Sequence, residues 1–302
     1  MLNTYPKISV VTVSYNQGEF IERTILSVLN QNYPNLEYII IDGGSTDLSV
    51  NIIKKYEAQL GYWVSEKDNG QYDAINKGFE HASGDIFCFL NADDIFLPWT
   101  LKTVASIFQS HQHVDWITSL AVAQMNADGI MMAAGTMNPI SVKAFSDGLY
   151  IPSKPSIGVI CQEGTFWRRS LWIKAGGKIN LNRKLAGDFD LWCNFMRYAP
   201  PYCIVMPLAV MTRHKDQRSN QMHIYREECI QSLAESRQFL NTDSNFKSAC
   251  RVFIWKKTRN YRMAWKFVKF LLSYKCNILN PGFDSNTFTL KWIETQMLVY
   301  KK

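Results

Sequence analysis

The order of apolar and polar positions along the first hundred residues predicts strands that alternate with helices. Residues 7–13, 36–41 and 85–90 are short apolar runs, rich in β-branched or aromatic residues, with the length of buried strands. Between the first two runs, apolar residues recur every three or four positions over 19–29, which is typical of a helix with one buried face. This alternation indicates an α/β fold with a mostly parallel central sheet flanked by helices.

Each of these strands is predicted to end in residues that can form hydrogen bonds. The first strand ends at Ser14-Tyr15-Asn16, the second runs into the turn 42–47, and the third runs into 91–94. Ligands of open α/β sheets bind outside the carboxyl ends of the strands, so we expect these polar loops to converge on one edge of the sheet. Such a convergence is typical of a nucleotide site.

Asp93 and Asp94 are adjacent carboxylates directly after a buried strand. Carboxylates in such a place are costly unless a positive charge compensates them. A divalent cation that carries a diphosphate would do so, because Mg²⁺ and Mn²⁺ prefer oxygen ligands. The alternative interpretation is that the pair caps a helix beginning near Pro98. This fragment alone leaves both interpretations open.

Taken in order, the polar motifs of the chain strongly resemble those of family 2 glycosyltransferases, which have the GT-A fold. The motifs are Ser14-Tyr15-Asn16, the segments 41–47 and 70–78, Asn91-Ala92-Asp93-Asp94, and the segments 162–169 and 187–192. The resemblance covers roughly residues 6–220. It implies a GT-A domain over residues 1–240 and an inverting enzyme that uses a nucleotide-diphospho-sugar, giving a β-linked product from an α-linked donor.

The resemblance also implies a metal site. Asp93 would be the direct ligand of Mn²⁺ or Mg²⁺, while Asn91, Ala92 and Asp94 would shape the donor site around it. The family often has an acid at the position of Asn91, so the outer coordination departs from the usual pattern. His214 would complete the metal site in its neutral form, or serve only as a structural residue.

The donor nucleotide is expected at the ends of the first two strands. Tyr15 offers a flat ring for stacking, and Asp42 can accept a hydrogen bond from a base N–H or a ribose hydroxyl. Gly43 stands where family members often have a second Asp that contacts uracil, which leaves the nucleotide base open, although a UDP-sugar is favoured. Gly70 belongs to the turn 68–70, whose backbone can approach the donor.

The acceptor hydroxyl must lose its proton as it attacks, and by resemblance Asp188 is the general base. A helix is predicted over 191–196, so that Asp188 would lie at a helix N-terminus, where the helix dipole favours a carboxylate. A capping role alone would also explain an Asp at this position. Glu163 and Trp192 are expected on the acceptor side of the site.

Composition and cysteine usage agree with an intracellular globular protein. Of 302 residues, 47% are hydrophobic and 20% charged, which excludes a disordered chain. The seven cysteines are scattered without a C-x-x-C pair, which favours reduced thiols. We find no signal-peptide core at the N-terminus and no apolar run of membrane-spanning length. A cytoplasmic location is therefore expected.

The basic excess lies near the C-terminus. Residues 247–302 contain twelve Lys or Arg and two acids, whereas the whole chain has a net charge of +7. We predict a helical, basic, aromatic-rich extension over 241–302 that binds the inner face of the plasma membrane, which suits a lipid-linked acceptor. The alternative is that these helices pack on the catalytic domain. No nucleic-acid module is present, so nucleic acid is not expected as a partner.

The function expected from the resemblance is transfer of a hexosyl or N-acetylhexosaminyl group to a hydroxyl of a glycan or lipid-linked glycan, in bacterial surface polysaccharide synthesis. The alternative is a non-catalytic subunit that binds a nucleotide-sugar or an acceptor. Other enzyme classes lack their motifs: the chain has neither G-x-G-x-x-G after the first strand nor G-x-x-x-x-G-K-[ST].

Overall fold

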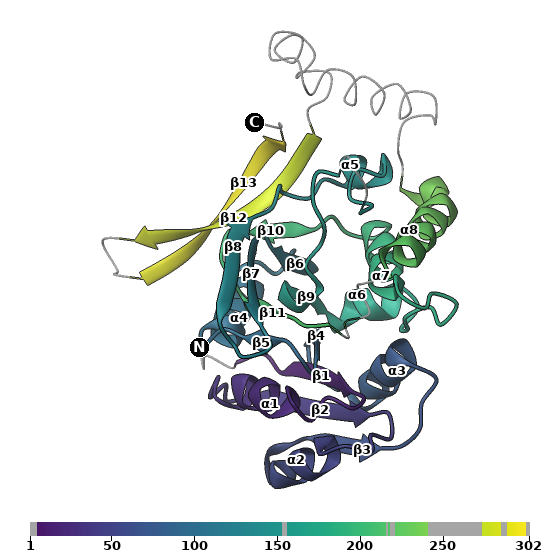
Figure 1. Ribbon diagram of the computed structural model, residues 1–302. Coiled ribbons are helices and arrows are strands. Elements are labelled where there is room, and N and C mark those ends of the chain that lie inside the picture. Colours follow the sequence, from purple (N-terminus) through teal and green to yellow (C-terminus); the bar gives the residue numbers. More distant parts are fainter. Residues whose placement is uncertain are drawn as a thin grey trace.

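The computed structural model describes residues 5–152, 156–215, 217, 221–240, 274–284 and 289–299. Within them, the central sheet has nine strands in the order β13-β12-β10-β6-β9-β4-β1-β2-β3. These strands are β1 (Ile8–Ser14), β2 (Leu36–Asp42), β3 (Tyr62–Ser65), β4 (Ile86–Asn91), β6 (Trp116–Ser119), β9 (Thr165–Arg168), β10 (Tyr202–Ile204), β12 (Tyr274–Asp284) and β13 (Thr289–Val299). Figure 1 shows their arrangement.

The pairing of the strands confirms a mostly parallel sheet. The neighbouring strands β3, β2, β1 and β4 pair in parallel, as do β6, β10 and β12. Strand β9 is antiparallel to both β4 and β6, so it joins the two parallel groups. All seven residues of β1 are buried, as expected for a strand covered on both faces.

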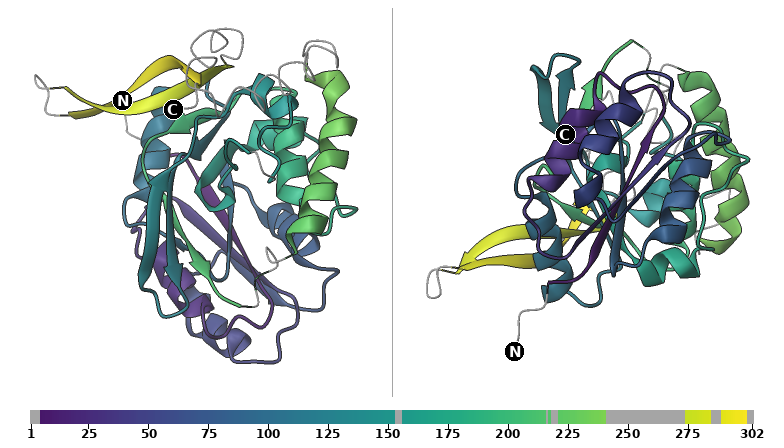
Figure 2. Two further views of the ribbon diagram at one scale, coloured as in Figure 1. Left: turned by 45° about the horizontal axis from the view of Figure 1, so that its top comes forward. Right: turned by 90° about the horizontal axis from the view of Figure 1, so that it is seen from below.

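Helices cover both faces of the sheet. They are α1 (Ile21–Leu29), α2 (Ser49–Lys55), α3 (Gln71–His81), α4 (Thr100–Ser110), α5 (Val142–Ser146), α6 (Arg169–Lys174), α7 (Gly187–Met196) and α8 (Met222–Ser236). Short 3₁₀ turns η1 (Glu57–Gln59), η2 (Gln162–Gly164) and η4 (Arg237–Phe239) lie between or after them. One core lies under α1, α2 and α4, and the other under α3, α5, α6, α7 and α8. Figure 2 gives two further views of these layers.

A smaller sheet places β11 beside the end of β4. Its order is β5-β11-β7-β8, with β5 (Ile95–Phe96), β7 (Ala121–Asn126), β8 (Met131–Thr136) and β11 (Ala209–Arg213). Strand β5 follows β4 after a short turn and pairs antiparallel with β11. The residues that follow β11 are thereby carried to the same sheet edge as the residues that follow β4.

The C-terminal extension differs from the sequence prediction. Residues 274–284 and 289–299 form the hairpin β12–β13, and β12 continues the central sheet by pairing in parallel with β10. The prediction of helices over 241–302 is wrong for these two stretches. Lys275 is exposed, whereas Cys276, Ile278 and Leu279 are buried, which suits a strand that lies between β10 and β13 and packs on the core. Residues 241–273 lie outside the described residues, so membrane binding there and a domain boundary at 240 stay predictions.

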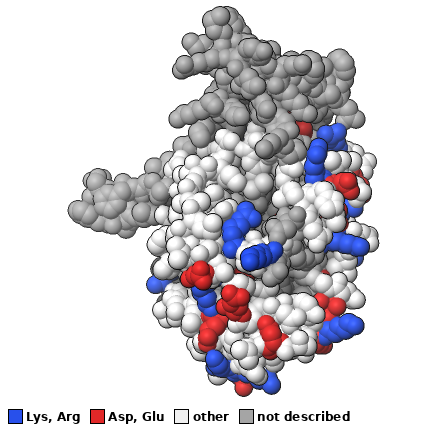
Figure 3. Space-filling model, in the orientation of Figure 1, with Lys and Arg blue, Asp and Glu red and all other residues white. Residues whose placement is uncertain are grey.

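Three observations bear on the remaining general expectations. Among the helices that the structure describes, none is both long and apolar enough to cross a membrane. No disulfide joins the described cysteines, five of which are buried. On the face drawn in Figure 3, acidic and basic side chains of the described residues are interspersed, so the basic excess of the chain is not concentrated on that part of the surface.

Candidate active site

Asp42 organises the loop at the end of β2. Its side chain is fully buried, and it accepts hydrogen bonds from the backbone N–H groups of Gly44 (3.2 Å) and Ser45 (2.8 Å). The hydroxyls of Ser45 (2.5 Å) and Ser65 (2.7 Å) also donate to it. Asp42 therefore fixes the shape of the predicted nucleotide loop from within, and its contact with a base stays a prediction.

The loop after β1 is joined to the loop after β2 through Asn16. The N–H of Asn16 donates to the hydroxyl of Ser45 (2.7 Å), and its amide oxygen accepts from the N–H of Thr46 (2.9 Å). Asn16 has a φ of +51°, which Asn tolerates better than most residues. The preceding Tyr15 side chain is 63% exposed, which is compatible with the predicted stacking role.

The space next to Gly43 is occupied by a carboxylate from another loop. A Cβ at position 43 would lie 2.6 Å from Oδ2 of Asp68. The other oxygen of Asp68 accepts the N–H of Gly70 (2.8 Å), which has a φ of +109°. The carboxylate of Asp68 thus lies against position 43, the position at which family members often have a second Asp. Sequence reasoning had only the turn character of 68–70 as a signal and missed this contact.

Asp93 and His214 meet although 121 residues separate them. Nε2 of His214 lies 2.9 Å from Oδ2 of Asp93, and the imidazole stacks on the ring of Phe20 with centroids 4.7 Å apart. The hydroxyl of Thr212, at the end of β11, donates to the backbone carbonyl of Asp93. The pairing of β11 with β5, the strand that follows Asp93 and Asp94, therefore brings the histidine to the carboxylate.

The donor set suits a cation shared with a ligand. Within the described residues, no group of three or more His, Cys, Asp or Glu side chains is arranged to hold a metal ion. Asp93 and His214 supply one oxygen-type and one nitrogen-type ligand. Mg²⁺ and Mn²⁺ are commonly bound by one or two protein groups together with substrate phosphates. The pair fits that mode of binding and does not fit an all-protein cage.

Asp94 faces the protein interior. It is 3% exposed, and it accepts the N–H of Thr212 (2.9 Å) and, at 3.4 Å, the amide of Asn91. The pKa of Asp94 lies well above its ordinary value, mainly because the carboxyl is buried and also because the charges of Asp93 and Glu163 are near it. The alternative that it caps a helix near Pro98 is wrong, because α4 begins at Thr100 without a side-chain cap. Asp94 instead attaches β11 to the end of β4.

Asn91 and Ala92 are held by three neighbouring elements. The amide of Gln71 on α3 donates to Oδ1 of Asn91 (2.7 Å), and the amide of Asn91 donates to Gln162 on η2 (3.3 Å). Ala92 is buried, and its carbonyl accepts the hydroxyl of Thr24 on α1 (2.7 Å). The segment that precedes Asp93 is therefore fixed, and any contact of Ala92 with a donor would involve its backbone.

Asp188 is the second residue of α7. The hydroxyl of Tyr225 lies 3.3 Å from each of its carboxylate oxygens. A Cβ on Gly187 would lie 2.7 Å from the ring of Tyr72, so glycine allows α7 to begin against α3. Burial raises the pKa of Asp188 to about 6, although hydrogen bonds from the Phe189 N–H and the hydroxyl of Tyr225 partly oppose it. A carboxylate with such a pKa is ionised at neutral pH and can accept a proton.

Glu163 is influenced by both Asp93 and Asp188. Burial raises the pKa of Glu163, the charges of Asp188 and Asp93 raise it further, and Arg213 lowers it. The turn η2, which carries Glu163, contacts both β4 and β11, and the charges of the predicted ligand Asp93 and the predicted base Asp188 both act on Glu163, so the three carboxylates share one acidic region. The residues predicted from separate motifs are thus brought together.

Trp192 does not belong to this region. It is 1% exposed, and its ring stacks on Trp116 with centroids 5.6 Å apart. The prediction of an acceptor-side role for Trp192 is wrong, because its side chain is buried against Trp116 and Trp167 of the sheet, one helical turn beyond Asp188.

Comparison with known sequences identifies the family. The sequence model of glycosyl transferase family 2 matches residues 9–181, and the chain belongs to this family. An uncharacterized glycosyltransferase of Mycobacterium tuberculosis is 44% identical over 96 residues, which cover 32% of this chain and 37% of the relative. The putative teichuronic acid biosynthesis glycosyltransferase TuaG of Bacillus subtilis is 40% identical over 97 residues, 31% of this chain and 38% of the relative. The match therefore spans less than half of these relatives.

Solved structures confirm the GT-A fold. Staphylococcus aureus TarS 1–349 in complex with UDP-GlcNAc has a TM-score of 0.57 and 16% identity, and the match covers 98% of this chain and 99% of that one. The mannosyltransferase PcManGT of Pyrobaculum calidifontis, in complex with GDP-Man and Mn²⁺, has a TM-score of 0.51 and 14% identity, covering 87% and 83%. At these identities the likeness shows the fold alone.

Proposed function

We propose that this glycosyltransferase moves a hexosyl or N-acetylhexosaminyl group from a UDP-sugar to a hydroxyl of a glycan or lipid-linked glycan, with inversion at the anomeric carbon. The observation that carries the proposal is the meeting of the Asp93–His214 pair with Asp188 in one acidic region, through Glu163. Sugar transfer requires a place for a diphosphate and a base for an alcohol within reach of one another. The two groups come from separate motifs, Asp93 from 91–94 and Asp188 from 187–192.

The diphosphate end is assigned to Asp93 and His214. They would hold Mn²⁺ or Mg²⁺, which when bound neutralises the charge that grows on the leaving diphosphate. The backbone of 91–94 is fixed by contacts from α1, α3 and η2, so these two side chains are positioned before a donor arrives. We assign the nucleoside to Tyr15 and to the loop that Asp42 organises.

The acceptor end is assigned to Asp188. As the acceptor oxygen attacks the anomeric carbon, its proton passes to the carboxylate of Asp188, and the nucleoside diphosphate leaves from the opposite side. A single displacement without an enzyme nucleophile inverts the configuration. Glu163 is assigned to a hydroxyl of the bound sugar. The family's hexose and N-acetylhexosamine donors are represented among the fold neighbours by GDP-Man and UDP-GlcNAc.

The pathway and the location are part of the same proposal. The names of two Bacillus subtilis relatives, TuaG and EpsE, the latter a putative glycosyltransferase 25% identical over 206 residues, support a role in bacterial polysaccharide synthesis. A cytoplasmic enzyme peripheral to the inner face of the plasma membrane would meet a lipid-linked acceptor there. None of the described residues supports the proposed location at the membrane.

The test begins with donor binding. Thermal shift would be measured with UDP-GlcNAc, UDP-glucose and GDP-mannose, with and without MnCl₂. We expect a Mn²⁺-dependent shift with a UDP-sugar, and turnover with water as the acceptor, detected as release of UDP. Proton NMR early in that hydrolysis should show the β anomer of the sugar. Release of the α anomer would refute inversion, and binding without turnover in the presence of any tested acceptor would favour a binding subunit.

A further inference from the structure

Helix α8 presents a polar face to the protein interior. Its buried residues recur every three or four positions and are Glu228, Cys229, Ser232, Leu233 and Ser236. A helix that packs on a globular core usually buries an apolar stripe, and buried polar groups cost free energy unless they are hydrogen-bonded. The hydrogen-bond partners of this face all belong to α7, to the loop before α7, or to α8 itself. The helix lies outside the residues matched by the family model.

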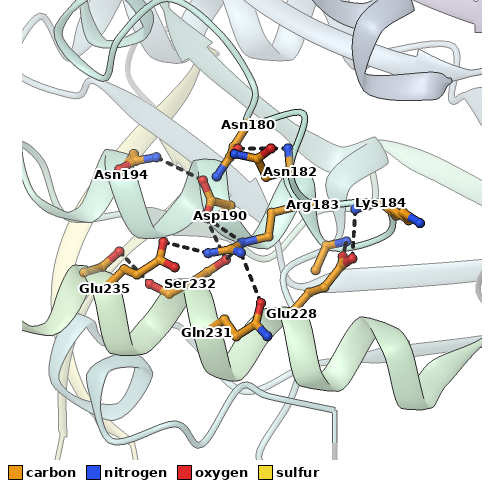
Figure 4. Close-up of polar contacts among 12 residues, drawn as sticks. Asn180, Asn182, Arg183, Lys184, Asp190, Asn194, Glu228, Gln231, Ser232 and Glu235 are labelled. Carbon is orange, nitrogen blue, oxygen red and sulfur yellow. Dashed lines mark hydrogen bonds and ion pairs between the residues drawn. The ribbon is translucent and has the colours of Figure 1, made fainter. Parts of the chain in front are cut away.

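Glu228 holds the loop that leads into α7. Its carboxylate accepts the backbone N–H groups of three consecutive residues, Lys184 (2.9 Å), Leu185 (2.8 Å) and Ala186 (2.8 Å). Burial raises the pKa of Glu228, but these bonds and the charge of Arg183 outweigh it, so the pKa lies below its ordinary value. Figure 4 shows the carboxylate facing this loop. The charged group thus fixes the backbone directly before Gly187.

Arg183 and Asp190 fasten the two sides of the same segment. Arg183 is only 7% exposed; its guanidinium donates to Ser232 (2.9 Å) and Gln231 (3.1 Å), and it pairs with Glu235 (2.6 Å). The hydroxyl of Ser232 donates to Asp190 (2.7 Å). These contacts, drawn in Figure 4, bind residues on either side of Asp188 to one helix.

Tyr225 extends the polar face of α8 as far as Asp188. It precedes Glu228 by three residues, and its hydroxyl lies 3.3 Å from both carboxylate oxygens of Asp188. The other groups that bear on Asp188 are Tyr72 from α3, Glu163 from η2 and Cys229 from α8. Tyr225 donates to the carboxylate, whereas Glu163 repels its charge and the hydroxyl of Tyr72 donates to the backbone carbonyl of Leu185 (2.5 Å). The hydroxyl of Tyr225 therefore favours the ionised form.

We propose that α8 is the positioning element of the base, with Glu228 setting the place of Asp188 through the backbone and Tyr225 orienting its carboxylate. This inference rests on the proposed function of Asp188. It assigns Glu228 and Tyr225 as positioning residues, which act on the substrate through Asp188. Small misplacements of a reacting group can cost about 100-fold in rate, so the element need move little to matter.

The first test compares Glu228→Gln with Glu227→Gln. Both change one acid of α8 to its amide, but Glu227 is exposed and serves as the matched control. In Glu228→Gln the new amide group turns a donor toward at least one of the three N–H groups, so the loop before Asp188 must shift. For hydrolysis of the UDP-sugar identified above, we expect kcat to fall about 10- to 100-fold in Glu228→Gln, with the Kd for UDP within about twofold. Glu227→Gln should leave both unchanged.

The second test is the pH profile of Tyr225→Phe. Removing a donor from the ionised carboxylate raises the pKa of Asp188. The acid limb of the profile of kcat should therefore move to higher pH by about half a unit to one unit. A purely structural role of Tyr225 would lower kcat without moving this limb. The variant keeps the ring, so it tests the inference even if Glu228→Gln does not fold.

The outcomes separate this inference from the proposed function. If Asp188→Asn turns over donor at the wild-type rate, the assignment of the base is wrong. A different combination refutes only the role of α8: Asp188→Asn is inactive, but Glu228→Gln has the same kcat as Glu227→Gln, and the acid limb of the kcat profile does not move in Tyr225→Phe. A parallel loss of kcat and UDP binding in Glu228→Gln would indicate general damage to the fold, and the pH profile of Tyr225→Phe then decides: an unmoved acid limb refutes the inference.

Discussion

Asp188→Asn is expected to make the protein more stable while it removes activity. Burial raises the pKa of Asp188 from 3.8 to about 6, which means that folding disfavours the charged carboxylate. At pH 8 the difference of about two pKa units corresponds to about 3 kcal/mol of lost stability, at 1.36 kcal/mol per unit. Asn keeps the shape and an acceptor for Tyr225 without the charge, so this loss should be relieved.

The sign and the pH range follow from the same shift. A carboxyl whose pKa is raised on folding binds protons more tightly in the folded state, so wild-type stability falls as pH rises from about 4 to about 6 and is level above that. The advantage of Asp188→Asn should be about 3 kcal/mol at pH 8 and about half of that at pH 5. In a chain of this size it amounts to roughly 6 °C in Tm at pH 8.

The assay is urea unfolding of both proteins at pH 8 and pH 5, with Asp190→Asn as a control. Asp190 undergoes the same chemical change two residues away, but it pairs with Arg183 (3.4 Å) and accepts from Ser232, so its loss should destabilise the protein. A variant Asp188→Asn that is no more stable than wild type at pH 8 would refute the reasoning. An advantage that stays constant between the two pH values would refute it as well.

Three further changes test the rest of the site. Asp93→Ala should abolish the Mn²⁺-dependent part of the thermal shift caused by UDP. Because the side chain is partly exposed, the Tm of the variant without ligand should stay within about 2 °C of the wild-type value. An undiminished shift would exclude Asp93 as a metal ligand. Gly187→Ala should lower the free energy of unfolding by about 1–3 kcal/mol, because the new methyl overlaps the ring of Tyr72; urea denaturation measures it, and an unchanged midpoint would contradict the close contact. Asp42→Ala should cost roughly 1–3 kcal/mol by leaving buried donors of its loop unpaired, and should weaken UDP binding in a titration.

Much of the fold could be predicted because its signals are local. The strands expected at 7–13, 36–41 and 85–90 are β1, β2 and β4 to within one residue. Continuous apolar runs between helical periods indicate buried parallel strands, and such strands place their ends at one edge. The register of β1 with β2 and β4 confirms that Asp42 and Asn91 lie at one edge of the sheet. The expectation that Asp188 faces the same edge came from the family resemblance, because Asp188 begins a helix and follows no strand.

The failures come from features that depend on distant partners. Trp192 lies on the same face of α7 as Asp188, one turn further along, and the sequence does not reveal where along this face the site ends and the core begins. Asp94 accepts a hydrogen bond from Thr212 on β11, which is 118 residues away in the sequence. The residues around Asp94 give no sign of this contact, so they could not exclude a capping role. The hairpin β12–β13 forms where β12 can pair with the free edge of β10. The sequence of 241–302 does not show that such an edge exists elsewhere in the fold.

The contact between Gly43 and Asp68 implies that two positions compete for one volume. A side chain at 43 and a carboxylate at 68 cannot both occupy it, so a carboxylate can enter from either loop but not from both. Moving the acid from 68 to 43 would shift its anchor from a turn to the end of a strand while keeping its charge nearly in place. Such an exchange between two loops would leave the sheet beneath them untouched.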